Sequence, residues 1–286
     1  MRNKIEAVCA VIVTFNIKEK IFKCLESIEK QVDYIIIVDN GSNFETIDIL
    51  KNLNKEYIKI IYNKNNEGIA KALNQGVKEA LTLNYNWILT LDHDSICKKN
   101  MVRKMMDSYK CINDINRIGI LCPEIYDVNG KFYLTQSNKE LDEVNTALQS
   151  GCIFNKDIFN KVGFFNEKLF IYYVDEEFFD RCIKRGYKII RIKGAILEHR
   201  EGEKEIKRLF FLKTHYNCYS EKAIYYIVRN SILMIYYDNK KYFYVCSKRI
   251  IGVFSKVLLF DKKKVTKLKF ALKGLLDGLI KKDGRL

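Results

Sequence analysis

Two aspartates separated by one residue follow a short apolar run in the N-terminal half of the chain. Trp87 to Leu91 is long enough for one buried strand, and Asp92 and Asp94 come directly after it. Ligands of open α/β sheets bind at the carboxyl ends of the strands, so both carboxylates are expected at a ligand-binding edge. Their oxygens suit Mg²⁺ or Mn²⁺ held partly by a substrate's phosphates. Acidic residues also end strands because turns favour them, so the pair alone leaves both interpretations open.

The segments before this pair alternate between strand and helix patterns. Apolar or β-branched runs predict buried strands at 7–14, 34–38 and 58–62. Helical spacing of apolar residues predicts amphipathic helices between and after them, at 18–30, 44–53 and 69–80. Three strand–helix repeats predict a doubly wound, mostly parallel α/β sheet flanked by helices.

Polar residues end these strands as well, among them Asn16, Asp39, Asn63 and Asn65. A nucleotide is the expected ligand of such an edge. However, no G-x-G-x-x-G follows the first strand, and no G-x-x-x-x-G-K-[ST] occurs in the chain. Dinucleotide-dependent enzymes and P-loop enzymes are therefore poor fits.

Four motifs occur in order along the first hundred residues, namely VIVTFN at 11–16, IVDNGS at 37–42, NEGIAKALNQG at 66–76 and LDHDS at 91–95. Together they resemble the donor half of family 2 glycosyltransferases with the GT-A fold. Within that family the resemblance is to bacterial rhamnosyltransferases of surface-polysaccharide assembly, and it spans about residues 7 to 230. It implies a GT-A domain at 1–235, with a nucleotide-sugar half at 1–100 and an acceptor half at 101–235.

The resemblance also implies roles for individual residues. The base and ribose of the nucleotide sugar would be held by Thr14, Phe15, Asn16 and Asp39. Asn74 would lie near the donor, and the Asp92/Asp94 pair would handle the ribose and the metal. Turn chemistry before Gly41 is the alternative for Asp39, and a plain helix-surface role is the alternative for Asn74.

Three further segments resemble the acceptor side of the family, namely SGCIF at 150–154, VGFFNEKLF at 162–170 and IYYVDEEF at 171–178. This implies acceptor-binding roles for Gly151, Tyr173 and Glu177. Asp175 is the predicted general base, because it stands near a helix start, where the charged form of a carboxylate is favoured. The alternatives are that Asp175 is only an N-cap and that Glu177 is the base. Tyr172 stands where relatives often carry an acid, which leaves the acceptor open.

His199 follows another predicted strand, at 187–192. In metal-dependent relatives a histidine at this point completes the metal site, so the resemblance implies Asp94 and His199 as ligands of Mg²⁺ or Mn²⁺. His215 is expected to be structural. Tyr225-Tyr226-x-x-Arg229-Asn230 also resembles the family, and Arg229 is placed with the donor-binding residues. Contact with the acceptor, or with an acid in the core, stays open for Arg229.

The net charge of +15 is concentrated near the C-terminus. From residue 240 to 286 there are 14 Lys or Arg and three Asp, a balance of +11. Apolar residues alternate with these cations, which predicts a helical extension at 236–286. It either packs on the core with its basic face in water, or forms an amphipathic surface attracted to anionic lipid.

The cysteine content and the hydropathy of the chain indicate its location in the cell. Nine cysteines without a Cys-x-x-Cys pair indicate a reducing environment. No stretch of 18 residues is free of charge, so no spanning helix is expected. Glu6 interrupts the first apolar run, so no signal peptide is expected. The predicted location is the cytoplasm, peripherally on the inner face of the cell membrane.

The predicted function is inverting, metal-dependent transfer of a sugar from a nucleoside diphosphate to a hydroxyl of a lipid-linked bacterial surface polysaccharide. L-Rhamnose from dTDP-rhamnose is the first donor, with UDP-hexose, UDP-GlcNAc or UDP-galactofuranose as alternatives. A sugar-1-phosphate nucleotidyltransferase should carry a glycine-rich basic loop after its first strand, which is not seen at 14–18. No nucleic-acid partner is expected, because the basic residues gather in the tail rather than among aromatic residues of the sheet. Homo-oligomerisation is left open.

Overall fold

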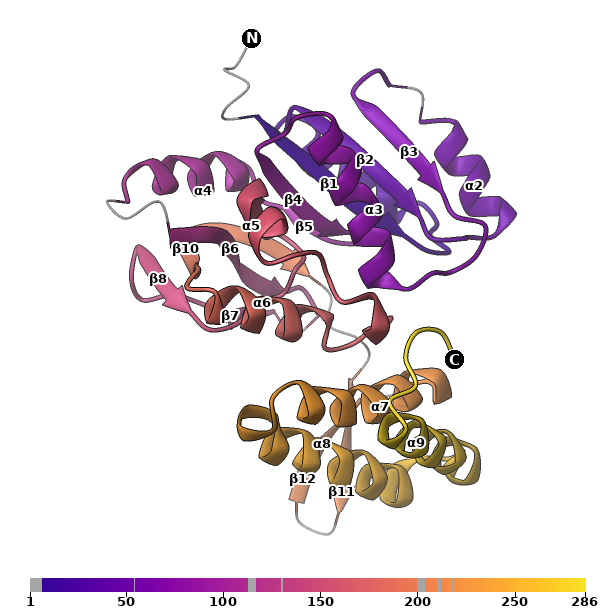
Figure 1. Ribbon diagram of the computed structural model, residues 1–286. Helices are drawn as coiled ribbons and strands as arrows, with labels where there is room; N and C mark the ends of the chain where they lie inside the picture. The colour runs from indigo at the N-terminus through magenta and orange to yellow at the C-terminus, as the bar shows by residue number, and fades with distance from the viewer. Residues whose placement is uncertain are drawn as a thin grey trace. The chain divides into compact units, whose positions relative to one another are not determined.

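The structure is a computed structural model that describes residues 7–53, 55–112, 117–129, 131–199, 204–209, 212–217 and 219–286. The chain forms two compact units. The sheet unit comprises Met1–Asn166 with Asp175–Arg200, and the helical unit comprises Glu167–Val174 with Glu201–Leu286. Figure 1 shows the elements of both units with their labels.

The sheet unit begins with four parallel strands in the order β3-β2-β1-β4. Their bounds are β1 Val8–Thr14, β2 Tyr34–Asp39, β3 Ile58–Tyr62 and β4 Trp87–Asp92. All seven residues of β1 are buried, as expected for a strand covered on both faces. The predicted strands and the parallel α/β arrangement are therefore confirmed.

The sheet continues beyond β4 with strands of mixed direction in the order β4-β9-β6-β10-β5. The bounds are β5 Ile96–Cys97, β6 Ile118–Asp127, β7 Phe132–Thr135, β8 Leu141–Val144, β9 Ile153–Asn155 and β10 Lys188–His199. β10 is longer than the predicted strand at 187–192, because a register shift between Arg191 and Ile196 absorbs Gly194 and lets pairing with β6 resume. His199 is therefore the last residue of a strand.

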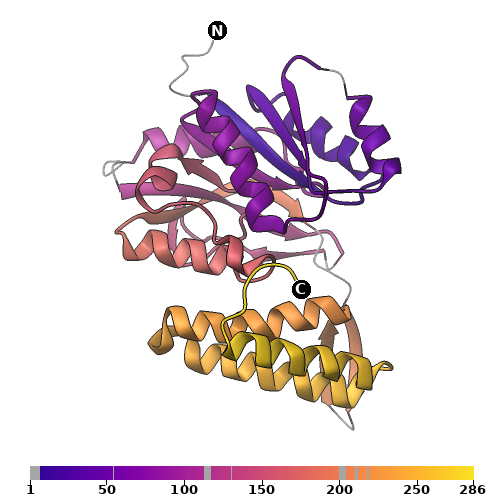
Figure 2. The same ribbon diagram turned by 45° about the vertical axis from the view of Figure 1, so that its right-hand side comes forward.

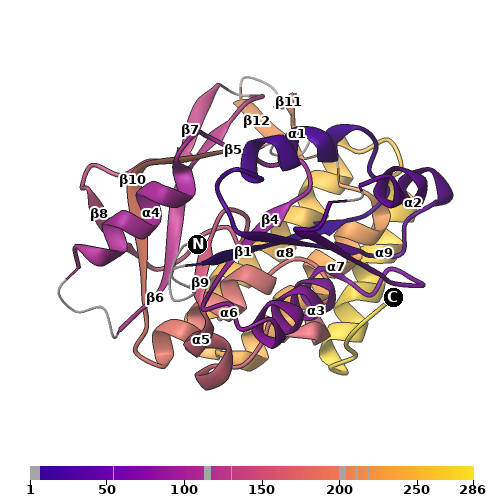
Figure 3. The same cartoon turned by 90° about the horizontal axis from the view of Figure 1, so that it is seen from above.

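Helices cover both faces of this sheet, as Figure 3 shows from above. On one face lie α1 Lys20–Ile28, α2 Phe44–Lys51 and α4 Met101–Lys110. On the other lie α3 Ile69–Thr82, α5 Lys156–Lys161 and α6 Val174–Lys184. The predicted helices at 18–30, 44–53 and 69–80 correspond to α1, α2 and α3.

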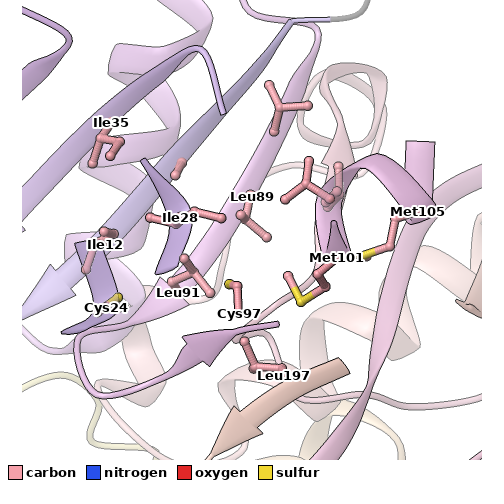
Figure 4. Packing of buried hydrophobic residues seen from close by; sticks show 14 of the residues in the cluster. Ile12, Cys24, Ile28, Ile35, Leu89, Leu91, Cys97, Met101, Met105 and Leu197 are labelled. Carbon is pink, nitrogen blue, oxygen red and sulfur yellow. The ribbon is translucent and has the colours of Figure 1, made fainter. Parts of the chain in front are cut away.

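One hydrophobic core lies between the sheet and the first group of helices. Ile12 and Leu89 of the sheet, Ile28 of α1 and Met101 of α4 are all essentially inaccessible to solvent. Figure 4 shows these side chains pointing toward one another. The Sγ of Cys24, a buried residue of α1, lies 3.7 Å from the backbone oxygen of Asp92. The core therefore reaches the carboxyl end of β4.

The helical unit contains α7 Glu221–Tyr237, α8 Asn239–Phe260 and α9 Lys264–Leu279, with a hairpin of β11 Lys204–Leu209 and β12 Leu212–Asn217. Figure 2 shows the three helices side by side in orange to yellow. Ile224 and Val228 of α7 share one core with Val257 and Ala271. We expected a separate extension at 236–286, whereas the compact unit of the structure also includes α7, which packs with α8 and α9. In the described part of the chain, no helix is long and apolar enough to cross a membrane.

Candidate active site

The strand register brings the polar strand ends of the N-terminal motifs to one edge of the sheet. Thr14 of β1 stands opposite Asp39 of β2, and Val13 of β1 stands opposite Asp92 of β4. The Thr14 Oγ1 donates a hydrogen bond to the Asp39 Oδ1 at 3.2 Å. The structure therefore places Thr14, Asp39 and Asp92 together, as the sequence predicted.

Ser42, which sequence reasoning missed, organises the loops at this edge. Its backbone N–H and its hydroxyl both donate to the carboxylate of Asp39, at 3.1 and 2.5 Å. Its Oγ also accepts from the backbone N–H of Asn16 at 2.8 Å. Phe15 is 41% exposed beside this network. Turn chemistry at Asp39 is thus shown, while contact of Asp39, Phe15 and Asn16 with a nucleotide stays a prediction.

Asn40, buried next to Asp39, connects two loops of the same edge. Its amide donates to the Asn66 Oδ1 and to the Gly68 backbone oxygen, both at 3.2 Å, and its Oδ1 accepts from the backbone N–H of Glu67 at 3.0 Å. Gly41 follows with a φ of +78°, and a Cβ there would lie 2.3 Å from a backbone atom of Asn65. The glycine is required for this close approach of the two loops.

Asn74 has a buried structural role in α3. Its side chain donates to the Phe165 backbone oxygen and accepts from the Phe165 N–H, both at 2.9 Å. It is 2% exposed, so the helix-surface alternative is wrong. The bonds fix the segment before residue 167 against α3, and a role of Asn74 near the donor stays a prediction.

Gln149 joins the acid at the end of β4 to the predicted base. Its Nε2 donates to the Asp92 Oδ1 at 2.8 Å, and its backbone N–H donates to the Asp175 Oδ2 at 3.0 Å. Thr90 holds this loop in place, because its Oγ1 donates to the Gln149 backbone oxygen and its own backbone oxygen accepts from the Gly151 N–H. Gly151 has a φ of +87°, and a Cβ there would lie 2.7 Å from a ring atom of Pro123. Gly151 therefore shapes the loop, and acceptor contact by Gly151 stays a prediction.

A second chain of hydrogen bonds leads from Asp92 to His199. The Asp92 N–H donates to the Ser150 Oγ at 3.0 Å, and the Ser150 and Ser95 hydroxyls are 2.9 Å apart. The Ser95 Oγ lies 3.3 Å from the His199 Nδ1. The structure thus brings His199 to the acid pair across more than a hundred residues of sequence. Sequence reasoning gave no role to Gln149 or Ser150, although Ser150 is the first residue of the SGCIF motif and Gln149 directly precedes it.

The residues around Asp92 are chemically suited to a divalent cation. His199 and Asp94 both lie close enough to Asp92 to act on its charge: burial raises the pKa of Asp92, His199 lowers it, and Asp94 raises it. The Oε1 of Gln149 is buried here, and no described residue donates a hydrogen bond to it. The described residues contain no cluster of three His, Cys, Asp or Glu side chains suited to a metal. A metal bound by Asp94 and His199 would therefore need phosphate oxygens to complete its ligands.

Asp175 lies in the first turn of α6 and is half-buried. We expected the helix start to keep its carboxylate ionised, and this is wrong. Burial raises the pKa of Asp175 to about 8, Glu176 and Asp92 act in the same direction, and the hydrogen bond from the Gln149 N–H opposes them. Loss of hydration therefore outweighs the favourable helix terminus. The carboxylate accepts from Gln149 in another loop, so it has a connecting role beyond that of a helix cap.

Glu177 is held in a two-point ion pair. Its two carboxylate oxygens accept from the Arg181 Nε at 2.6 Å and from an Arg181 terminal nitrogen at 3.0 Å. Arg181 also donates to the backbone oxygens of Val162 and Phe164. This pairing disfavours Glu177 as the base, because both of its carboxylate oxygens already accept hydrogen bonds from Arg181. Its predicted acceptor contact stays a prediction.

In the helical unit, Arg229 is fully buried and bonds to the protein itself. Its guanidinium donates to the backbone oxygens of Lys168, Leu169 and Gly284. It also lies 4.9 Å from the ring centre of Tyr226. The prediction that Arg229 binds the donor is not supported by this arrangement, because these carbonyls occupy its donors.

Asn230 and Tyr173 also serve the helical unit. The Asn230 amide donates to the backbone oxygens of Leu169, Ile171 and Tyr172. Tyr173 is buried, and its hydroxyl lies 2.8 Å from the Ser231 Oγ. Its predicted acceptor contact is therefore not supported either. His215 lies in β12, where the side chains fall outside the described part of the structure.

Comparison with known proteins agrees with this geometry. The sequence model of the family described as Glycosyl transferase family 2 matches residues 9–179. A dTDP-rhamnosyl transferase, RfbF, of Shigella flexneri is 27% identical over 94% of this chain and 94% of its own length. The low-salt glycan biosynthesis hexosyltransferase Agl10 of Haloferax volcanii is 24% identical over 96% of this chain and 92% of its own length.

Solved structures of sugar transferases share the fold. S. aureus TarS 1–349 in complex with UDP-GlcNAc superposes with a TM-score of 0.56 at 19% identity, over 95% of this chain and 72% of that one. GalNAc-T7 with UDP, GalNAc and Mn²⁺ gives a TM-score of 0.59 at 15% identity, over 96% of this chain and 56% of that one. The predicted GT-A fold, a central sheet flanked by helices with further C-terminal helices, is confirmed.

The pKa of Asp175 predicts a pH-dependent stability. Its carboxyl titrates near 3.8 when exposed and near 8 in the folded chain, so the folded state binds the extra proton between these values. The free energy of unfolding should therefore fall as pH rises from about 4 through 8. Asp175→Asn keeps an acceptor for the Gln149 N–H but cannot titrate. Urea unfolding from pH 5 to 9 should show a shallower pH dependence for the variant than for wild type, and parallel curves would contradict the assignment.

Proposed function

The chain belongs to glycosyl transferase family 2, and from this premise we propose a donor, an acceptor and a metal for this glycosyltransferase. The donor is a nucleoside diphosphate sugar, with dTDP-L-rhamnose first, and the acceptor is a hydroxyl of a lipid-linked bacterial surface polysaccharide. The hydrogen-bonded path from Asp92 through Gln149 to Asp175 carries the proposal, because it joins the nucleotide edge to the predicted base. The name of the Shigella relative, which matches nearly end to end, supports rhamnose. UDP sugars are the second candidate, because TarS binds UDP-GlcNAc on the same fold.

Asp94 and His199 would hold Mg²⁺ or Mn²⁺ together with the diphosphate of the donor. When bound, the ion would neutralise the charge that develops on the departing diphosphate. Ser95 would orient His199, since its hydroxyl meets the Nδ1 and leaves the Nε2 as the imidazole's ligand atom. Asp92, positioned by Gln149 and by the Ser150 hydroxyl, would contact the ribose.

Asp175 would accept the proton of the attacking hydroxyl in an inverting transfer. A single carboxylate is sufficient for this, because the hydroxyl displaces the diphosphate directly without a covalent sugar–enzyme intermediate. The base must be ionised when it acts, and a pKa near 8 provides a strong proton acceptor close to neutral pH. The backbone N–H of Gln149 fixes one oxygen of Asp175. Its other oxygen would receive the proton.

The metal assignment predicts loss of nucleotide binding in Asp94→Ala. Wild type should gain roughly 2.7 kcal/mol of stability from a nucleotide sugar at about 100 times its Kd. A thermal-shift panel of dTDP-rhamnose, UDP-hexoses and UDP-GlcNAc, with and without Mn²⁺ or Mg²⁺, should identify the donor. Asp94→Ala should lose the metal-dependent part of this gain. Asp107→Ala, an exposed acid on α4, is the matched control and should behave as wild type. Full metal-dependent affinity in Asp94→Ala would contradict the assignment.

The base assignment predicts that Asp175→Asn binds donor normally and transfers roughly 10²-fold or more slowly. In wild type, kcat/KM should rise with pH through an apparent pKa near 8, and the variant should lack this rise. Sugar transfer is measured with the donor found in the panel. Glu177→Gln is the comparison. If it abolishes transfer while Asp175→Asn stays active, the base is Glu177.

The helical unit is proposed to dock the enzyme on the inner face of the cell membrane. Exposed apolar residues recur at helical spacing along α9, namely Val265, Leu272, Leu276 and Leu279. Lysines at 262, 269 and 273 stand among them, within the segment whose charge balance is +11. Apolar side chains that enter the lipid interface beside cations that attract anionic headgroups favour a peripheral membrane contact.

Leu276→Glu is expected to weaken this contact, because it puts a negative charge in the middle of the apolar stripe. Sedimentation with liposomes should show wild-type binding that rises with anionic lipid and falls with salt. Leu83→Glu, an exposed leucine after α3, is the matched control and should bind as wild type. Binding that ignores lipid charge and salt would overturn the proposal and leave the stripe as an oligomer contact.

A further inference from the structure

The helical unit contains a cavity of about 620 Å³ that the proposed chemistry does not use. Its volume lies within the range of small-molecule sites. Its apolar lining includes Ile224, Ile227 and Val257, all almost fully buried, and Ile251, which is largely exposed. The cavity lies between α7 and α8, and apolar side chains line it from its buried interior to the surface.

The same cavity carries cations and no acids among its described lining residues. Lys248, Arg249 and Lys256 line it, all from α8. Lys256 follows Lys248 by eight residues and Arg249 by seven, which is about two helical turns, so the three cations share one side of the helix. An apolar cavity with several cations matches a ligand that has a hydrocarbon part and an anionic group. A sugar or a nucleotide alone would leave the apolar lining unmatched.

The cavity is also connected to the segment that leads into α6. Tyr219, which lines it, meets the ring of Tyr172 edge to face, with ring centres 6.3 Å apart. The guanidinium of Arg249 lies 4.7 Å from the ring centre of Tyr173. Asp175 follows Tyr173 by two residues along the chain. A ligand in this cavity would therefore touch side chains that contact the segment just before α6.

We propose that this cavity binds one anionic amphiphile, an alkyl or prenyl chain that ends in a phosphate or diphosphate. The hydrocarbon would contact Ile224, Ile227 and Val257, and the phosphate would meet Lys248 and Lys256. Resting on the proposed function, the ligand is the lipid end of the acceptor, held here while its sugar end is extended. This role differs from the membrane contact of α9, which needs no cavity.

Calorimetric titration of the full chain tests this with three probes below their micelle concentrations. Decyl phosphate has both parts, decyl maltoside has the chain without the charge, and inorganic phosphate has the charge without the chain. Decyl phosphate should bind at least about tenfold more tightly than either of the others, because apolar burial and charge-assisted hydrogen bonds both contribute.

Two variants test the apolar space and the cations of the cavity separately. Gly252 lines the cavity, and a Cβ there meets nothing within 4 Å, so Gly252→Leu should add bulk without disturbing α8. It should weaken both decyl probes. Lys248→Gln with Lys256→Gln should weaken decyl phosphate about tenfold and leave decyl maltoside unchanged. Lys23→Gln with Lys51→Gln removes the same charge from exposed lysines of α1 and α2 and is the matched control.

Equal binding of decyl phosphate to wild type and to every variant would overturn the proposal, because it would locate the probe on exposed apolar surface. Inorganic phosphate that binds as tightly as decyl phosphate would also overturn it. Thermal shifts of the same proteins with nucleotide sugars distinguish a failure of the lipid site from a failure of the proposed function. If no nucleotide sugar binds while Gly252→Leu still removes decyl phosphate binding, the proposed function fails and the lipid site stands.

Discussion

The register of three parallel strands is the constraint on which the site depends. Backbone hydrogen bonds hold β1, β2 and β4 so that Thr14, Asp39 and Asp92 end at one level. Side chains in a strand alternate between faces, so a slip of one residue would move every apolar residue of β1 out of its packing. Burial on both faces therefore fixes the register, and the register places the polar strand ends together. The buried core therefore determines where these polar groups stand.

A second constraint joins the two halves of the sheet unit. The loop before β9 turns at Gly151, in a backbone conformation that favours glycine, and Thr90 of β4 bonds to both sides of the turn. This turn directs Gln149 toward Asp92 and Asp175. Asp92 and Asp175, the predicted ribose contact and the predicted base, are thus positioned by one loop anchored to one strand. A change in this loop would displace both carboxylates together.

Sequence patterns predicted the sheet and many of the polar residues at its carboxyl edge. The physical reasons for this also explain which residues were not predicted. Strand ends are local, so the position of Asp39 and Asp92 at one edge of the sheet could be predicted from short apolar runs. Gln149, Ser150 and Ser42 act through bonds across loops, and no periodicity marks such residues. The burial of Arg229 could not be predicted, because a motif does not report burial. A guanidinium surrounded by carbonyl groups and one exposed to a ligand look the same in sequence.

Arg229 and Asn230 hold the backbone of the segment that precedes α6. Phe170, Tyr172 and Tyr173 all have φ between +62° and +65°, a conformation that costs about 1 kcal/mol or more for each non-glycine residue. The carbonyls of this segment accept from the Asn230 amide, and those just before it accept from Arg229. Buried hydrogen bonds, several of them to a charged donor, offset this strain. These hydrogen bonds therefore hold the backbone that leads into α6 in one conformation, and this backbone ends two residues before Asp175.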